Sequence, residues 1–214
     1  MFLMASFLMS NNLGQLFRHH VVARLAEQDA PATEVSLFDF TAPNADVSGW
    51  IESSDTVRVP GKSKAAIVLQ KARLFQRAVF FALLNPQPNG AGFAGVRHPT
   101  DFDLSQFSSI NIKLRGQGQN KNFKITMKHH GEVGDASVSY EQFFEAPTAE
   151  ELQVLSLPLV EFKPYWRGML QNDSQPLDTS NITSMGIQFY GGVYEEGKQS
   201  GPSTLEIDWI KASN

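Results

Sequence analysis

Short apolar runs separated by turn-forming residues dominate the chain from Pro31 onward, and they constrain the fold more than any other feature. Most runs alternate apolar and polar residues, the period-two pattern of a strand with one buried face. Segments of this kind lie at residues 35–40, 63–70, 74–84, 109–115, 121–130, 137–144, 152–157, 182–190 and 203–210. Turn-forming residues separate them, for example at Asn85–Gly90 and Gly116–Asn120. The pattern predicts an all-β sandwich with no long helix after residue 33.

Composition excludes several classes of protein. The 214 residues include 18 Lys and Arg against 22 Asp and Glu, a formal charge of -4, so no overall positive field would attract nucleic acid. There is no cysteine, which excludes disulfides, a thiolate nucleophile and cysteine-bound zinc or iron-sulfur centres. Hydrophobic residues make up 42% of the chain, which is enough for one sizeable core.

Residues 1–33 differ from the rest of the chain, and we expect them to form a leader or helical extension before a sandwich domain at residues 34–214. They contain Arg18 and Arg24 and no acidic residue before Glu27, with apolar residues at near-helical spacing. Two interpretations remain open: a mitochondrial targeting helix, or a short helix that simply precedes the domain. A secretory signal fits less well, because the basic residues follow the apolar run. That run, Phe2 to Met9, is too short to span a membrane.

Alternation within two neighbouring runs assigns their side chains to faces. We expect one set to lie in the core, namely Ile110, Ile112, Leu114, Phe123, Ile125 and Met127. The intervening cations should point outward, and they include Lys113, Arg115, Lys124 and Lys128. If the two strands pair across the turn at residues 116–120, these cations share one face of a sheet. Glu206 and Asp208, on the polar side of the last strand opposite Leu205, Ile207 and Trp209, could offset the charge, as could an anionic or polar partner.

Motifs that would indicate catalysis or a cofactor fail in context. Gly90–Gly95 satisfies the dinucleotide pattern G-x-G-x-x-G, but no helix or βαβ unit follows it. The histidine pairs, His19–His20 and His129–His130, are adjacent, and adjacent strand residues point to opposite faces, so neither pair is suited to chelation. There is no G-x-S-x-G elbow. We therefore predict no catalytic residue, no metal site and no cofactor.

Aromatic residues leave a second possibility open. Gln188 and Tyr190 alternate against Met185, Ile187 and Phe189, so they should face outward and could contact a partner or a sugar ring. Tyr140 shares a face with Val138 and should lie in the core. The sequons at Asn172 and Asn181 would be glycosylated only in the secretory pathway. A carbohydrate-binding sandwich is thus the alternative to a protein-binding domain.

Taken in order, several runs resemble the complex I intermediate-associated protein 30 family. The resemblance covers about residues 35–212, and the matching pieces are Leu37–Phe40, Trp50 with Asp55 and Gly61–Ser63, Gly92–Arg97, Arg115–Gly118, Leu157–Leu159 with Phe162–Pro164, and Leu205–Ile210. One departure is Pro60, which stands where the family often has a second glycine before the serine of the first turn.

The resemblance implies a galactose-binding-like jelly-roll sandwich without enzymatic activity. It also implies a chaperone or assembly factor that binds intermediates of mitochondrial NADH:ubiquinone oxidoreductase, complex I; a cytoplasmic or secretory location is the alternative. The candidate contact residues, for a protein partner or for a glycan, are Lys113, Arg115, Lys124, Lys128, Gln188 and Tyr190.

Overall fold

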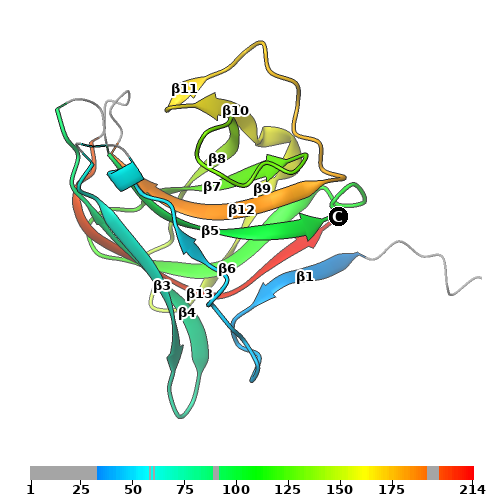
Figure 1. Ribbon diagram of the computed structural model, residues 1–214. Helices are drawn as coiled ribbons and strands as arrows, with labels where there is room; N and C mark the ends of the chain where they lie inside the picture. Colours follow the sequence, from blue (N-terminus) through cyan, green and yellow to red (C-terminus); the bar gives the residue numbers. More distant parts are fainter. Residues whose placement is uncertain (1–32, 58, 60, 89–91, 192–197) are drawn as a thin grey trace, which may run out of the picture. The chain divides into compact units, whose positions relative to one another are not determined.

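The computed structural model describes residues 33–57, 59, 61–88, 92–191 and 198–214, and within them two β-sheets pack face to face (Figure 1). The strands are β1 (Glu34–Asp39), β2 (Ile51–Glu52), β3 (Lys64–Lys71), β4 (Gln76–Leu84), β5 (Phe93–Phe102), β6 (Ser109–Gln117), β7 (Asn122–His129), β8 (Ser139–Glu145), β9 (Gln153–Pro158), β10 (Lys163–Trp166), β11 (Met169–Leu170), β12 (Ile182–Tyr190) and β13 (Gly201–Ser213). The helical segments of the described residues are two short 3₁₀ turns, η1 (Asp55–Val57) and η2 (Leu159–Glu161). The predicted all-β sandwich is confirmed, and the predicted N-terminal helix lies outside the described residues.

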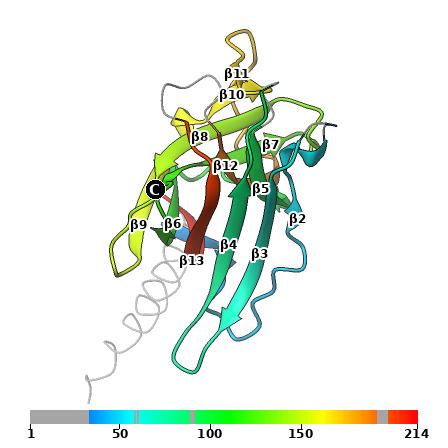
Figure 2. The same cartoon turned by 90° about the vertical axis from the view of Figure 1, so that its left-hand side faces the viewer.

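The two sheets are antiparallel and mix strands that are distant in sequence. One has the order β3-β4-β13-β6-β9, with β1 added alongside the C-terminal half of β13. Figure 2 shows this sheet with β3 and β9 at its edges. The other has the order β11-β10-β8-β7-β12-β5-β2. Sequential strands therefore often lie in different sheets, as expected of a sandwich with crossing connections.

The core lies between the sheets and comes from the inward positions of both. All six residues predicted for it from the two alternating runs are fully buried. Phe80, Phe123 and Phe189 meet there, with ring centroids 6.4 Å apart for Phe80 and Phe123 and 5.3 Å apart for Phe123 and Phe189. Tyr140 is also buried, and its hydroxyl donates to the Gln175 carbonyl oxygen at 2.8 Å. This packing is the main source of stability, because each buried aromatic side chain removes a large apolar area from water.

The 109–115 and 121–130 runs do not pair with each other, so the condition under which their cations would share one face is not met. β6 pairs with β13 and β9, whereas β7 pairs with β8 and β12 in the other sheet. The chain crosses between the sheets just after β6, where Gly118 has a φ of 104° that suits glycine. The cations of β6 and β7 therefore lie on opposite outer faces of the sandwich.

The predicted face of Trp209 is also wrong. The pairing of β13 with β6 shifts register between Ile207 and Trp209, which inserts a bulge at Asp208. Before the bulge Leu205 and Ile207 point inward, and after it Ile210 and Ala212 do. Trp209 is turned outward, where the Lys211 ammonium lies 4.7 Å from its ring centroid.

Among the described residues, no helix is long and apolar enough to cross a membrane.

Candidate binding cleft

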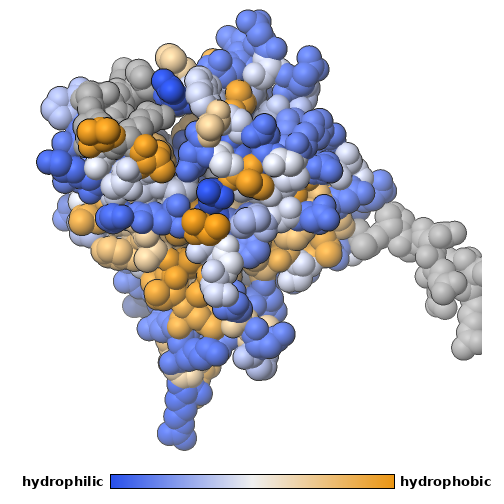
Figure 3. Space-filling view, viewed as in Figure 1, coloured by the Kyte–Doolittle hydropathy of each residue, from blue (hydrophilic) through white to orange (hydrophobic). Residues whose placement is uncertain are grey.

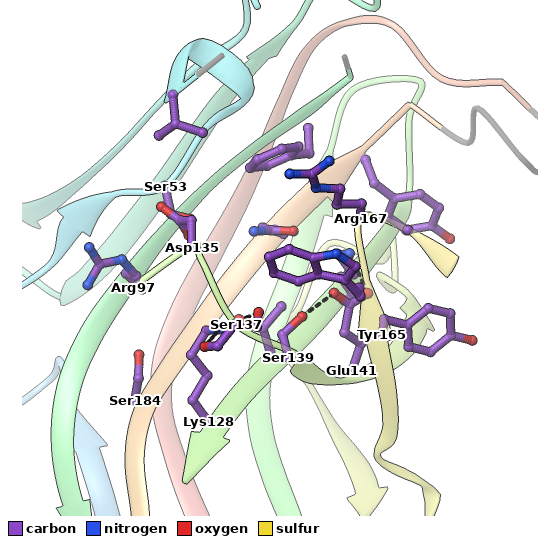
Figure 4. Close-up of a pocket in the computed structure, with 18 of the residues that line it drawn as sticks. Ser53, Arg97, Lys128, Asp135, Ser137, Ser139, Glu141, Tyr165, Arg167 and Ser184 are labelled. Carbon is purple, nitrogen blue, oxygen red and sulfur yellow. Dashed lines mark hydrogen bonds and ion pairs between the residues drawn. The ribbon is translucent and has the colours of Figure 1, made fainter. Parts of the chain in front are cut away.

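A cleft of about 620 Å³ opens on the outer face of the seven-stranded sheet. Its floor is formed by outward side chains of β5, β7, β8 and β12, and its walls by the β10–β11 hairpin, the segment 135–137 and the region around η1. Figure 4 shows Ser53, Asp135 and Arg97 toward one end, and Tyr165 and Arg167 toward the other. The end with Arg97 is rich in polar groups, and the other end is rich in aromatic rings.

Lys124 and Lys128 point outward from β7, as predicted, but the walls of the cleft cover them so that each is only 7% exposed. Lys124 donates to Glu141 Oε2 at 2.5 Å, and the Ser139 hydroxyl donates to Glu141 Oε1 at 2.6 Å. This buried ion pair fixes the Glu141 carboxylate in the cleft floor, because a buried charge requires a partner.

Lys128 has a different set of partners. It donates to the Ser137 carbonyl oxygen at 2.9 Å, the Ser137 hydroxyl at 2.8 Å and the Val138 carbonyl oxygen at 3.2 Å. Burial lowers the pKa of Lys128, and the nearby carboxylates of Asp135 and Glu132 oppose that shift. Lys128 therefore fastens the segment 137–138 to the sheet and holds one wall of the cleft in place.

The aromatic end depends on a tight turn. Tyr165 pairs with Leu170 and Trp166 with Met169, so Arg167 and Gly168 form a two-residue hairpin loop. Their φ values are 52° and 79°, the combination found in the type I′ turns that join strands this closely. This turn brings Tyr165, Trp166 and Arg167 to the rim of the cleft.

The rings at this end contact one another edge to face. The Phe143 centroid lies 5.4 Å from that of Tyr165 and 5.1 Å from that of Tyr190. The Lys124 ammonium lies 5.6 Å from the Phe143 centroid and 5.9 Å from the Tyr190 centroid. The rings provide a firm apolar surface on which a flat or apolar group of a ligand could pack.

The opposite end carries an arginine, Arg97, that has no partner among the described residues. Arg97 lines the cleft from β5, its Nε is buried, and its guanidinium makes no hydrogen bond or ion pair with any described residue. Close by, the Ser53 hydroxyl donates to Asp135 Oδ1 at 2.7 Å. A guanidinium of this kind can donate to carboxylate, carbonyl or hydroxyl oxygens of a ligand.

The structure divides the six candidate contact residues between two faces. Lys124, Lys128, Gln188 and Tyr190 line the cleft. Lys113 and Arg115 lie on the outer face of the other sheet, where Arg115 contacts Glu206 at 3.0 Å and Lys113 contacts Asp208 at 3.0 Å. The interpretation that Glu206 and Asp208 offset these cations is confirmed.

The cleft residues that sequence reasoning missed include Arg97 and Phe143. Arg97 was missed because the sequence analysis predicted no strand between residues 84 and 109 and weighed the run before Arg97 as a dinucleotide motif, although the ten residues of β5 lie there. Phe143 shares its face of β8 with Glu141, and it pairs across the sheet with Lys124, so the alternation in 137–144 could have shown that it faces outward.

A second polar cluster lies at the end of β7, away from the cleft lining. His129 and His130 do not point to opposite faces, as their adjacency had suggested, because His130 lies beyond the strand with a φ of 55°. Their rings stack with centroids 4.1 Å apart. The Asp178 amide donates to His129 Nδ1 at 2.9 Å, and Asp178 Oδ2 lies 2.6 Å from His130 Nε2.

The geometry of this cluster indicates a structural role and not a catalytic one. The Ser180 hydroxyl donates to Asp178 Oδ1 at 2.6 Å, so it is directed at the carboxylate and not at a histidine base. Hydrogen bonds from His130 and Ser180 hold the pKa of Asp178 well below its usual range. In the part of the chain that the structure describes, no group of three His, Cys, Asp or Glu side chains is placed to hold a metal ion.

Comparison with known proteins shows a family whose profile matches this chain and solved structures that share its fold. The profile of the complex I intermediate-associated protein 30 family matches residues 38–207. An uncharacterized protein of Schizosaccharomyces pombe is 31% identical over 145 residues, which cover 64% of this chain and 64% of that protein, less than two thirds of its length.

Among solved structures, the family 11 carbohydrate-binding module of a cellulosomal cellulase of Clostridium thermocellum superposes with a TM-score of 0.59 at 18% identity, covering 85% of this chain and 94% of the module. The same module in complex with a β-1,3-1,4-mixed-linked tetrasaccharide gives a TM-score of 0.59 at 19% identity, covering 85% and 95%. At this identity the likeness establishes the fold alone, a jelly-roll β-sandwich.

Proposed function

Because the chain belongs to the complex I intermediate-associated protein 30 family, we propose that it is a non-catalytic assembly factor that binds protein intermediates of mitochondrial NADH:ubiquinone oxidoreductase. The observation that carries the proposal is the match over residues 38–207, which includes every strand of the cleft floor. Binding without catalysis also suits the cleft, where the two lysines are engaged in structural contacts and are not free to act as bases.

We assign partner contact to the cleft and not to all six candidate residues. A partner touching Lys113 and Arg115 as well as Tyr190 would have to reach both outer faces of the sandwich. Gln188 and Tyr190 can touch a partner directly, together with Phe143 and Arg97. Lys124 and Lys128 then act indirectly, by holding Glu141 and the segment 137–138 in position.

The first test is capture of complex I subunits by the tagged full-length chain in its own cells. We expect a mitochondrial product, shortened by about the first 25 to 33 residues as a targeting segment would be, that migrates in a large complex with complex I subunits on a native gel. Phe143→Ala with Gln188→Ala should reduce the captured subunits about tenfold, since central aromatic contacts dominate interfaces.

The matched control is Val154→Ala, an exposed apolar residue on β9 in the other sheet. It should leave capture unchanged, and both variants should keep the wild-type thermal midpoint, because neither Phe143 nor Val154 is buried. A wild-type chain that captures no complex I subunit contradicts the function. Capture that survives the cleft variant contradicts the assignment of the cleft.

A sugar-binding role is the second candidate, and one observation favours it. Aromatic rings, the Gln188 amide and the Arg97 guanidinium, which has no partner in the part of the chain that the structure describes, line one cleft, and sugars are bound by such combinations of apolar and polar groups. The solved module that holds a mixed-linked tetrasaccharide has the same fold.

The sugar-binding candidate predicts saturable binding of that tetrasaccharide in a calorimetric titration. Tyr190→Ala should weaken it at least tenfold, because a stacked ring contributes about 1 kcal/mol beyond the area it buries. Val154→Ala is again the control. Absence of heat with this sugar and with a panel of neutral and acidic glycans would exclude this candidate while leaving the assembly role intact.

A further inference from the structure

The β3–β4 hairpin has a composition unlike that of the rest of the chain. Residues 64–84 contain Lys64, Lys71, Arg73 and Arg77 and no acidic residue, in a chain whose formal charge is -4. The hairpin extends beyond the other strands of the sandwich, as Figures 1 and 2 show. A cationic element is thus presented at one end of an otherwise acidic molecule.

Apolar side chains lie exposed at the tip of this hairpin. β3 and β4 are joined by residues 72–75, with the Ala72 amide donating to the Phe75 carbonyl oxygen at 2.9 Å. Leu74 is 91% exposed and Phe75 is 42% exposed. Side chains of this kind cost free energy in water, so a tip that presents two in sequence is suited to entering an apolar medium.

A second group of exposed apolar side chains lies on the outer face of the hairpin. Val68, Phe81 and Leu83 are exposed on it, and cross-strand pairing places Val68 beside Val79 and Ala66 beside Phe81. Figure 3 shows hydrophobic side chains gathered over the hairpin, with hydrophilic ones at its end. This apolar patch lies on the part of the hairpin nearer the body of the sheet, and the Gln70–Arg77 pair separates it from Leu74 and Phe75 at the tip.

The charges of the hairpin separate into engaged and free ones. Arg77 contacts Glu206 and Asp208 and lies over the Phe75 ring, and Lys64 contacts Glu52. Lys71 and Arg73 make no hydrogen bond or ion pair with any residue that the structure describes, and both are exposed. Two exposed cations without a described partner therefore directly precede Leu74 and Phe75 in the turn.

From this arrangement we infer that the β3–β4 hairpin docks the protein on an anionic lipid bilayer. Leu74 and Phe75 enter the boundary between headgroups and acyl chains, and Lys71 and Arg73 contact the phosphates of acidic lipids. A lipid surface suits this element better than a protein groove does, because the tip is a narrow convex projection with cations beside its apolar residues. The inference does not depend on the proposed assembly role, since the cleft and the hairpin are built from different strands.

The test is flotation of the full-length chain with vesicles of phosphatidylcholine alone, or of phosphatidylcholine and phosphatidylserine at about 7:3, in roughly 0.1 M salt where charges still act over about 10 Å. We expect the chain to float with the anionic vesicles much more than with the neutral ones. Lys71→Gln with Arg73→Gln should lower the partition coefficient about 25-fold, or about fivefold for each cation lost. Leu74→Ser with Phe75→Ser should lower it at least tenfold by removing the apolar insertion.

The matched control is Lys62→Gln with Lys198→Gln, which removes the same charge at two exposed residues outside the hairpin. It should lower partition less than threefold. Since every variant carries residues 1–32, their contribution is the same in all. The inference is overturned if the chain floats equally with neutral and anionic vesicles, or if both hairpin variants still bind the anionic vesicles. It is also overturned if the hairpin variants lose a protein partner but keep vesicle binding.

Discussion

Replacing Glu206 by Gln is expected to lower the free energy of unfolding by about 3 kcal/mol at neutral pH. The substitution removes one of the two negative charges from a largely buried network of ion pairs, so the buried cations lose a partner. Glu206 is 8% exposed, and its carboxylate accepts hydrogen bonds from Arg115 at 3.0 Å and from Arg77 and Gln117 at 2.5 Å. The substitution leaves Arg77 and Arg115 beside a neutral amide, and the Asp208 carboxylate that remains is shared between Arg77 and Lys113. Urea unfolding of the two proteins measures the difference.

The effect should depend on pH in a defined direction. Burial alone would raise the pKa of Glu206, but the hydrogen bonds and charges of Arg115 and Arg77 outweigh it and hold the pKa below its usual value. Below the ordinary glutamate pKa of about 4.3 the unfolded chain therefore binds the proton first. The stabilisation by Glu206 is complete above that pH and is lost as the pH falls through the lower, folded pKa, so the two proteins should converge in acid.

Glu145→Gln is the control for this network. Glu145 forms an ion pair with Lys121, but its side chain is 59% exposed, and exposed pairs contribute about 0.5 kcal/mol or less. Equal losses for the two substitutions, or a Glu206 effect that does not change between pH 7 and pH 3, would contradict the role given to the buried network.

The regular parts of the fold could be predicted because they follow local rules. In β6 and β7, side chains alternate between core and surface without interruption, so six core residues were identified from the period alone. Gln188 and Tyr190 were placed on the outer face of β12 by the same argument, and both line the cleft. In a strand without a β-bulge, a period-two pattern shows which side chains face the core and which face outward.

The remainder depended on contacts between distant parts of the chain. Nothing local distinguishes a turn that joins paired strands from one that crosses between sheets, so the sequence left open whether β6 and β7 pair with each other. The bulge at Asp208 reverses the face of Trp209, and its cause is the register with β6. Lys124 and Lys128 were recognised as outward, but the cleft walls that bury them come from segments 135–137 and 165–168. Strand pairing, strand register and the burial of a side chain by a distant segment all depend on tertiary structure.

Replacing Asp55 by Ala is the second substitution for which we expect a large effect. It should lower the free energy of unfolding by about 3 kcal/mol, because it removes two hydrogen bonds to a buried carboxylate together. Asp55 is fully buried in η1, and it accepts from the Ser63 amide at 2.9 Å and the Ser63 hydroxyl at 2.7 Å. The Ser63 hydroxyl oxygen in turn accepts from the Asn85 amide at 3.0 Å, so the loss should spread to the start of β3 and the end of β4.

The geometry around Asp55 also explains why glycine stands at position 61. A Cβ there would lie 2.0 Å from the Asp55 carbonyl oxygen, closer than any side chain can approach, so the loop must pass directly over η1. Trp50, Asp55 and Gly61–Ser63 are among the residues on which the family resemblance rests. The hydrogen bonds between Asp55 and Ser63 close the loop that carries Val57 and adjoins Ser53 at the cleft wall.

Asp55→Asn should lower the free energy of unfolding less than Asp55→Ala does, because the amide oxygen of Asn can still accept one of the two hydrogen bonds. Asp173→Ala, at an exposed position, should leave the unfolding midpoint unchanged. If Asp55→Ala unfolded at the same urea concentration as Asp173→Ala, the loop would not depend on this carboxylate, and the family residues around it would need another explanation.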